Sequence, residues 1–146
     1  MAISTEDKIE IMELLSKAAH YYHVQDWEKL AMVYAPGVVT EMEGISLQYH
    51  GVDGHIAHAK ESAKQTDGKD RDYYANMFIE EEPGGARVSY TFLNINTGSI
   101  PMECKLVVSG RHSDSVVKTS DGWRISHRRL TFDQKFDRSE EHTSEL

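Results

Sequence analysis

The sequence predicts a single α+β domain, in which three helices pack on one face of a cone-shaped, curved antiparallel sheet and enclose a pocket. Two observations carry this prediction. Apolar residues recur at steps of three and four in the first part of the chain, and the spacing changes to two in the rest. Helices followed by a run of strands are typical of α+β architecture. The 146 residues can bury one core but not two.

The first helix is expected to begin behind Ser4, because Ser4 followed three residues later by Asp7 resembles a capping box. One apolar stripe then continues as far as Tyr22. A short second helix is predicted over 27–34. It must end at the proline-glycine pair at 36–37, because proline restricts the residue before it and glycine interrupts regular structure.

A strand over 38–43 and a third helix over 53–63, capped by Asp53, complete the first part of the chain. Turn residues then divide the second part into four strands, over 72–80, 87–96, 102–118 and 123–133. Gly110 lies inside the long third strand of this series and is expected to mark a β-bulge.

Alternation along these strands assigns side chains to faces. On strand 72–80, one face would carry Asp72, Tyr74, Asn76 and Phe78, and the other Tyr73, Ala75, Met77 and Ile79. On the long strand, Arg111, Ser113 and Ser115 share a face, while His112 and Asp114 lie on the opposite one. An acid, a tyrosine and an amide on one face suit a pocket with a few polar groups in apolar walls. A solvated sheet face is the alternative, and alternation alone leaves both open.

Composition excludes several classes of function. A net charge of -8 argues against a nucleic-acid partner. A single cysteine, Cys104, excludes an internal disulfide and a cysteine-based zinc cluster. The chain has no apolar run long enough for a transmembrane helix, and its acidic N-terminus is unlike a signal peptide. We therefore expect a cytoplasmic protein with a small-molecule substrate, no membrane partner and no nucleic-acid partner.

No metal and no cofactor are predicted. His20 with His23, and His55 with His58, are spaced three residues apart, but no fixed third ligand accompanies either pair. No glycine-rich phosphate loop is present either. His112 is expected on the surface or on a sheet face.

Residues 138–146 are set aside from the fold. Arg-Ser-Glu-Glu-His-Thr-Ser-Glu-Leu resembles the in-frame translation of a DNA-sequencing adapter. A genuine acidic tail is the alternative, and it would be disordered as well. The single domain is expected to span residues 1–137.

Short motifs then suggest a family. Tyr-His-Val-Gln-Asp-Trp at 22–27, followed by Leu30 and by Tyr-Ala-Pro at 34–36, resembles the opening of the SnoaL-like families in the nuclear-transport-factor-like (NTF2-like) superfamily. Asp-Gly-Trp-Arg-Ile at 121–125 resembles the late hairpin of these proteins. Within the superfamily, the scytalone dehydratases are most similar, with Tyr-Asp-x-x-Asp-Trp followed by Ala-Pro. The resemblance implies the fold predicted above and a cofactor-independent lyase.

The resemblance also implies catalytic residues. Those lyases pair an Asp at the end of the first helix with a His on the strand after the third helix. The matching positions hold His23 and Asp72, so the two residue types are exchanged. A carboxylate would still face an imidazole, with His23 as the base, Asp72 orienting it and Tyr22 polarising a carbonyl.

Further positions carried over from the family line its pocket. Ser113 and Ser115 match pocket-wall positions, Arg111 lies two residues before them, and Arg128 matches an arginine of the last strand. Met42 stands where scytalone dehydratase has a tyrosine. Together with Tyr74 and Asn76 from strand alternation, these residues form the predicted substrate-binding set.

The sequence therefore favours a lyase (a dehydratase) or an isomerase that acts by general acid/base catalysis on a small hydroxylated carbonyl compound. A polyketide-type cyclase is a close alternative, and a non-catalytic ligand-binding protein or accessory subunit is a more distant one. His23 and Asp72 in contact across a closed pocket would favour the enzyme. A homo-oligomer, a trimer or a dimer, is expected because Tyr73, Met77 and Ile79 would otherwise leave an exposed apolar patch.

Overall fold

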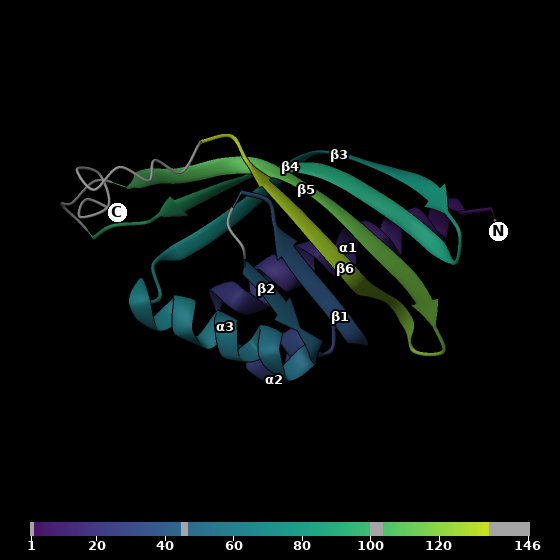
Figure 1. Cartoon of the computed structure of the whole chain (residues 1–146), viewed down its shortest axis with the longest axis horizontal. Helices are drawn as coiled ribbons and strands as arrows, with labels where there is room; N and C mark the ends of the chain where they lie inside the picture. The colour runs from purple at the N-terminus through teal and green to yellow at the C-terminus, as the bar shows by residue number, and fades with distance from the viewer. Residues whose placement is uncertain (1, 45–46, 100–103, 135–146) are drawn as a thin grey trace.

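The computed structural model describes residues 2–44, 47–99 and 104–134, and in it the helices lie on one side of a curved sheet (Figure 1). The predicted domain end at 137 and the tail at 138–146 lie outside these residues. The helices are α1 (Thr5–His23), α2 (Trp27–Ala31) and α3 (Gly51–Gln65). The strands are β1 (Tyr34–Met42), β2 (Leu47–His50), β3 (Asp70–Glu82), β4 (Gly85–Asn96), β5 (Lys105–Thr119) and β6 (Gly122–Phe132).

The six strands are ordered β2-β1-β6-β5-β4-β3. The predicted α+β class is confirmed, but the sheet is mixed, because β1 runs parallel to β6 while the other neighbours are antiparallel. The parallel pair joins the first strand to the last, and all the other strands and α3 lie between them in the chain. Such a distant pairing leaves no local sequence signal.

The capping box of α1 is present as predicted. The Asp7 backbone N–H donates to Ser4 Oγ over 3.0 Å, and the Ser4 N–H donates to the Asp7 carboxylate over 3.1 Å. The same carboxylate accepts from Trp123 Nε1 at 3.0 Å and from Lys118 Nζ at 3.1 Å. One acidic side chain therefore starts the helix and ties it to the β5–β6 hairpin.

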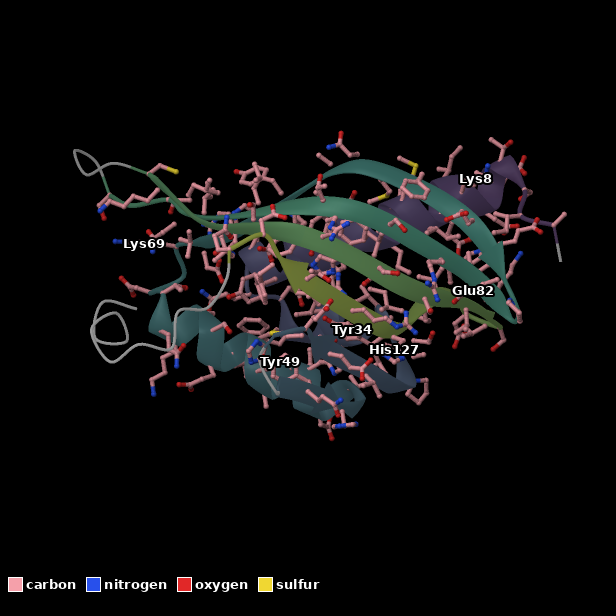
Figure 2. The ribbon with its side chains drawn as sticks, turned by 45° about the horizontal axis from the view of Figure 1, so that its top comes forward. Lys8, Tyr34, Tyr49, Lys69, Glu82 and His127 are labelled. Atoms are coloured by element: carbon pink, nitrogen blue, oxygen red, sulfur yellow. The ribbon has the colours of Figure 1, made fainter. Side chains whose placement is uncertain are left out.

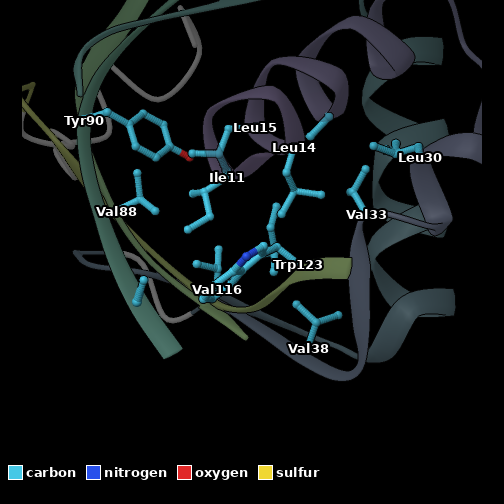
Figure 3. Packing of buried hydrophobic residues seen from close by; sticks show 14 residues of the cluster. Ile11, Leu14, Leu15, Leu30, Val33, Val38, Val88, Tyr90, Val116 and Trp123 are labelled. Atoms are coloured by element: carbon cyan, nitrogen blue, oxygen red, sulfur yellow. The ribbon is translucent and has the colours of Figure 1, made fainter. Parts of the chain in front are cut away.

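The hydrophobic core fills the space between α1 and the concave face of the sheet (Figure 3). Ile11 and Leu15 from the helix meet Val116, Trp123 and Ile125 from β5 and β6, and all five are buried. Burying a large aliphatic or aromatic side chain contributes about 1.5–3 kcal/mol to folding. This core holds one end of the sheet, and a pocket occupies the other.

Several predicted element boundaries are corrected by the structure. The second helix ends at Ala31 rather than at 34, and the chain enters β1 at Tyr34. Pro36 then lies within β1, between Tyr34 and Val39, where the pairing with β6 shifts register. At such an irregularity a proline is tolerated, because no ladder hydrogen bond needs its missing N–H.

The third helix begins at Gly51, ahead of the predicted Asp53, and β2 just before it was not predicted. Gly110 is not a bulge, because it pairs regularly with Phe92 and Phe132. A Cβ at this position would lie 2.2 Å from the carbonyl oxygen of Thr131. Close approach of the neighbouring strand, rather than a bulge, requires this glycine.

An irregularity in β3 overturns the predicted faces of its second half. The register between β3 and β4 shifts between Ala75 and Phe78, and Asn76 adopts a φ of 55°. Beyond this point the alternation is inverted. Met77 and Ile79 pack against the core, whereas Phe78 is exposed.

Candidate active site

A pocket of about 180 Å³ lies between the concave face of the sheet and helices α1 and α3. Five of the sequence-predicted site residues form part of its wall: Tyr22, Met42, Asp72, Tyr74 and Arg128. They come from α1, β1, β3 and β6, so the fold brings together side chains that are up to 106 positions apart (128 minus 22). An engineered apolar cavity of ~150 Å³ holds one benzene ring, so this pocket has room for a small molecule.

The other predicted substrate-binding residues lie on the opposite, outer face of the sheet. Asn76, Arg111 and Ser113 border a shallow hollow there, and the Ser115 hydroxyl accepts from Arg129 at 3.4 Å. Their prediction as pocket residues is therefore wrong. On β5 the alternation is offset by one residue from the family match, and the inward side chains are His112, Asp114 and Val116.

The predicted His23–Asp72 pair is not formed among the described residues. Each residue of an α-helix turns the side-chain direction by about 100°. Tyr22 lines the pocket, whereas the next residue, His23, is not among the residues of its wall. His23 lies within electrostatic range of Arg71 and of Asp70, which does line the pocket. Its nearest ring neighbour is His20, with centroids 6.5 Å apart.

Two carboxylates stand side by side at the start of β3. Asn94 on β4 donates to both Asp70 and Asp72, the latter over 2.8 Å. The Tyr22 hydroxyl donates to the second oxygen of Asp70 over 2.8 Å. Tyr22 therefore uses its proton on Asp70 and has none left to polarise a carbonyl, contrary to the role that the resemblance implied.

The environment of Asp72 adjusts its proton affinity. Burial raises the pKa of the Asp72 carboxyl to about 6, and the negative charge of Asp70 adds to the rise. The hydrogen bond from Asn94 and the Arg128 guanidinium act in the opposite direction. A carboxyl group with a pKa near 6 can both accept and return a proton at neutral pH.

Arg128 is a buried cation on the same pocket wall. Its Nη2 donates to the Tyr90 hydroxyl over 2.8 Å and lies 3.3 Å from the Asp114 carboxylate. Tyr90 also donates to Asp114 over 2.5 Å. Burial alone would raise the pKa of the Asp114 carboxyl, but the guanidinium holds it below its ordinary value. Asp114 therefore stays ionised and keeps Arg128 in place.

Two further tyrosines interact with this guanidinium from the pocket side. Tyr34 and Tyr74 both line the pocket, and both hydroxyls are within interaction range of Arg128. Burial raises the pKa of both phenols, so their hydroxyls remain protonated and can donate hydrogen bonds. The pocket wall therefore carries several hydrogen-bond donors, from Tyr34, Tyr74 and Arg128. The same wall also carries the carboxyl groups of Asp70 and Asp72.

Three histidines also line the pocket, and burial lowers the pKa of each: His55, His58 and His112. His55 Nδ1 lies 2.6 Å from the carbonyl oxygen of Gly51, which can only accept, so Nδ1 carries the proton. Nε2 then accepts from the Thr40 hydroxyl at 2.6 Å. His55 is therefore a neutral structural residue with no lone pair left for catalysis.

His112 lies on a face of the sheet, as one of the two expectations had it, but on the inner face rather than on the surface. It is buried, its ring stacks on Tyr90 with centroids 4.7 Å apart, and Nδ1 lies 3.4 Å from Asp114. Because burial outweighs the attraction of Asp114, its pKa falls and the ring is neutral at pH 7. The pocket therefore does hold an imidazole beside a carboxylate, on β5 instead of α1.

Sequence reasoning missed Asp70, Asn94 and Asp114 as site residues. Extending the predicted strand by two residues would have placed Asp70 on the face of Asp72 and Tyr74. Asp114 alternates with His112 and the buried Val116, a signal that was present in the sequence. Asn94 gives no such signal, because its role depends on the register of β3 against β4.

Among the described residues, no group of three or more His, Cys, Asp or Glu side chains is arranged to hold a metal ion. No described helix is both long and apolar enough to cross a bilayer.

Comparison with known proteins identifies the family and the fold. Residues 4–129 match the SnoaL-like domain. The chain belongs to the SnoaL-like family. This family includes polyketide cyclases, dehydratases and isomerases. No curated protein sequence matches the chain.

Solved structures show that the SnoaL-like chain has the NTF2-like, cystatin-like fold. Aln2 from a Streptomyces species superposes with a TM-score of 0.80 at 21% identity, over 89% of this chain and 93% of that one. An NTF2-like protein with a cystatin-like fold from Novosphingobium aromaticivorans gives a TM-score of 0.77 at 16% identity, over 97% and 89%. ActVI-ORFA from Streptomyces coelicolor gives 0.76 at 14% identity, over 86% and 97%. At these identities the likeness establishes the fold alone, and the similarity to scytalone dehydratase rests on short motifs.

Proposed function

We propose that this SnoaL-like protein is an isomerase or a dehydratase that removes a proton next to the carbonyl group of a small hydroxylated compound, with Asp72 as the base. The observation that carries the proposal is the placement of the Asp72 carboxyl in the same pocket as the buried Arg128 guanidinium. A base and a stabiliser of negative charge in one water-poor site are what enolisation requires.

The donors on the Arg128 wall would bind the carbonyl oxygen. As Asp72 takes the proton from the neighbouring carbon, negative charge moves to that oxygen. The guanidinium, with the Tyr34 and Tyr74 hydroxyls, stabilises the enolate. Preorganised donors of this kind are commonly worth ~10²–10³-fold in kcat each.

The protonated Asp72 then determines the outcome. If it gives the proton to a hydroxyl on the next carbon, the C–O bond breaks, water leaves and an enone forms. If the hydroxyl is instead on the carbon that lost the proton, its own proton moves to the former carbonyl oxygen. Asp72 then gives its proton to the former carbonyl carbon, and the product is the isomeric hydroxy carbonyl compound. Asn94 keeps the carboxyl oriented by its hydrogen bond of 2.8 Å, and Asp70 acts as a positioning residue by raising the pKa of Asp72.

A second candidate function has its own support. Because His23 is not part of the pocket wall and makes no hydrogen bond or ion pair with Asp72 among the described residues, the catalytic pair of the related lyases is not reproduced. A pocket that binds a small ligand without turnover is consistent with that loss. The two candidates differ in whether Asp72 exchanges a proton with a bound carbonyl compound.

The test follows proton exchange directly. 4-Hydroxycyclohexanone is incubated with the protein in D₂O, and proton NMR measures the loss of signal at the carbons next to the carbonyl. 3-Hydroxycyclohexanone, which can lose water, is followed by the absorbance of the enone. We expect exchange above the buffer rate and, with the second compound, enone formation.

The matched variants are Asp72→Asn in the pocket and Glu43→Gln on the outer face. Asp72→Asn should lower the exchange rate by roughly 10²–10⁴-fold, since general base catalysis is worth that much. Glu43→Gln should leave the rate unchanged, because Glu43 bonds the outer Thr131 hydroxyl at 3.1 Å. Exchange at the buffer rate with every carbonyl probe would favour the binding protein, and full activity in Asp72→Asn would remove this residue as the base.

A further inference from the structure

Two buried polar atoms in the pocket wall have no hydrogen-bond partner among the described residues: Tyr49 Oη and Arg128 Nε. Leaving a buried polar group unpaired costs about 1–3 kcal/mol, so native proteins rarely keep one without a reason. Both residues line the same pocket, although they come from β2 and β6. Their shared location points to a ligand that completes both hydrogen bonds.

Both side chains are fixed by their surroundings. The Tyr49 ring stacks on His58, with centroids 3.8 Å apart and planes at 25°, and meets the edge of His55 at 6.0 Å. Figure 2 shows Tyr49 together with Tyr34 on the side of the molecule where β1 and β2 meet α3. Arg128 is only 8% exposed, and its Nη2 is held by both Tyr90 and Asp114.

The size and charge of the pocket restrict the ligand. A volume of about 180 Å³ is only slightly larger than the ~150 Å³ that holds one benzene ring. Asp114 already neutralises Arg128, and Asp70 and Asp72 supply further negative charge. An anionic ligand would therefore meet net repulsion, whereas a neutral one would not.

We infer that the pocket takes an uncharged, single-ring compound with two oxygen substituents, one accepting from Arg128 Nε–H and the other bonded to the Tyr49 hydroxyl. Burial raises the pKa of Tyr49 to about 12, so this hydroxyl stays protonated and can donate or accept. The inference identifies the substrate class of the proposed enzyme. It rests on the proposed function in one respect only, namely which of the two oxygens belongs to the reacting carbonyl group. It predicts that fused two-ring compounds bind more weakly than single-ring ones, because they exceed the volume of the pocket.

Binding of phenols tests the inference without any turnover. The full-length protein is titrated by calorimetry with phenol, resorcinol, hydroquinone, benzoate and 2,7-dihydroxynaphthalene at pH 7. We expect resorcinol or hydroquinone, which differ in the spacing of their two oxygens, to bind more tightly than phenol. Benzoate and the two-ring diol should bind at least tenfold more weakly than the better of these two diphenols. Tighter binding of the two-ring compound would overturn the single-ring assignment, and tighter binding of benzoate would overturn the neutral one.

Tyr49→Phe isolates one of the two contacts. It removes only a hydroxyl that lacks a partner among the described residues, so the melting temperature should not fall. The better diphenol should lose roughly threefold to tenfold in affinity, as expected for one neutral hydrogen bond, while phenol should be unaffected. In this variant phenol should still bind more tightly than fluorobenzene, because Arg128 Nε remains. Tyr73→Phe, which alters an exposed tyrosine on the outer face, is the control and should change nothing.

The outcomes separate this inference from the proposed function. Binding as described with no proton exchange would reject the enzyme and keep the ligand class. Proton exchange with equal diphenol affinities in the native protein and Tyr49→Phe would keep the enzyme and reject the Tyr49 contact. Equal affinities of phenol and fluorobenzene would reject the Arg128 contact.

Discussion

The inner and outer faces of the sheet carry the same kinds of residue with opposite consequences. On β6, Arg128 points inward and is buried with Asp114 and Tyr90. Its neighbour Arg129 points outward, and its hydrogen bonds within the described part of the chain are long ones, at 3.4 Å, to Ser113 and Ser115. The covalent chemistry of the two arginines is identical. Burial and fixed partners turn one into part of a site, because electrostatic interactions strengthen as water is excluded.

The acids of the two faces differ in the same way. Asp72 inside the pocket has its pKa raised to about 6 by burial. On the outer side, Glu41 accepts from His127 Nε2 at 2.6 Å and is 42% exposed, so water competes with this contact. The comparison teaches that polar residues on a strand indicate a site only when the face they occupy is known.

The largest expected effect is on the free energy of unfolding, and it distinguishes the two arginines. Arg128→Gln leaves the buried Asp114 carboxylate without its cation and should lower the free energy of unfolding by about 3 kcal/mol or more. Arg129→Gln removes only outer contacts and should change it by less than about 0.5 kcal/mol. Urea denaturation of both variants measures the difference. Similar losses in the two proteins would contradict the assignment of Arg128 to a buried network.

The second prediction concerns the pH dependence of activity. If the ionised Asp72 is the base, kcat/KM should fall about tenfold per pH unit below a pKa near 6. Glu43→Gln is the control. It removes an acid on the outer face and should leave the fall in kcat/KM at low pH unchanged. Rates of 4-hydroxycyclohexanone exchange between pH 4 and 8 provide the measurement. A flat profile over this range would exclude Asp72 as the base.

The third prediction concerns stability. The folded-state pKa of Asp72, about 6, lies above the ordinary value of 3.8. The stabilisation from its bound proton is therefore fully present below 3.8 and is lost as the pH rises through 6. Asp72→Asn removes this loss. The melting temperature of the variant should therefore exceed that of the native protein by a few degrees at pH 8. Towards pH 4 the difference should disappear. A lower melting temperature at pH 8 would show that ionised Asp72 stabilises the fold.

The homo-oligomer expected from the sequence stays a prediction. The apolar surface that would form the contact between subunits differs from the one expected from the sequence. Met77 and Ile79 pack against the core, whereas Tyr73, Phe78 and Leu93 are exposed apolar side chains on β3 and β4. We expect light scattering at micromolar concentration to give the mass of a dimer or trimer, and Phe78→Asp to shift it towards the monomer. A monomer mass for the native protein would reject this expectation.

The smallest effects on catalysis are expected for two residues that the sequence assigned to the site but that are not in the pocket wall of the structure. Arg111→Lys changes an exposed side chain on the outer face, and His23→Ala changes one that is not part of the pocket wall. Both should leave kcat and KM for the exchange reaction unaltered. A tenfold change in either constant would mean that these residues reach the substrate after all.

The sequence by itself determined the parts of this protein that depend on local interactions. The capping box at Ser4 and Asp7, the helix-then-strand order and the SnoaL-like motifs between 22 and 36 all follow from residues close together in the chain. Tyr22, Met42, Asp72, Tyr74 and Arg128 were also placed at the pocket, because family positions or simple alternation hold at those sites.

Only the tertiary structure decided the rest. The irregularity at Asn76 inverts the faces of β3, and the match to β5 was one residue out, which moved Arg111 and Ser113 to the outer face. A strand has a side-chain period of two, so a slip of one residue exchanges the inside and the outside. Asn94 beside Asp72, like the burial that gives this carboxyl its raised pKa, exists only once the strands are paired and the helices cover them.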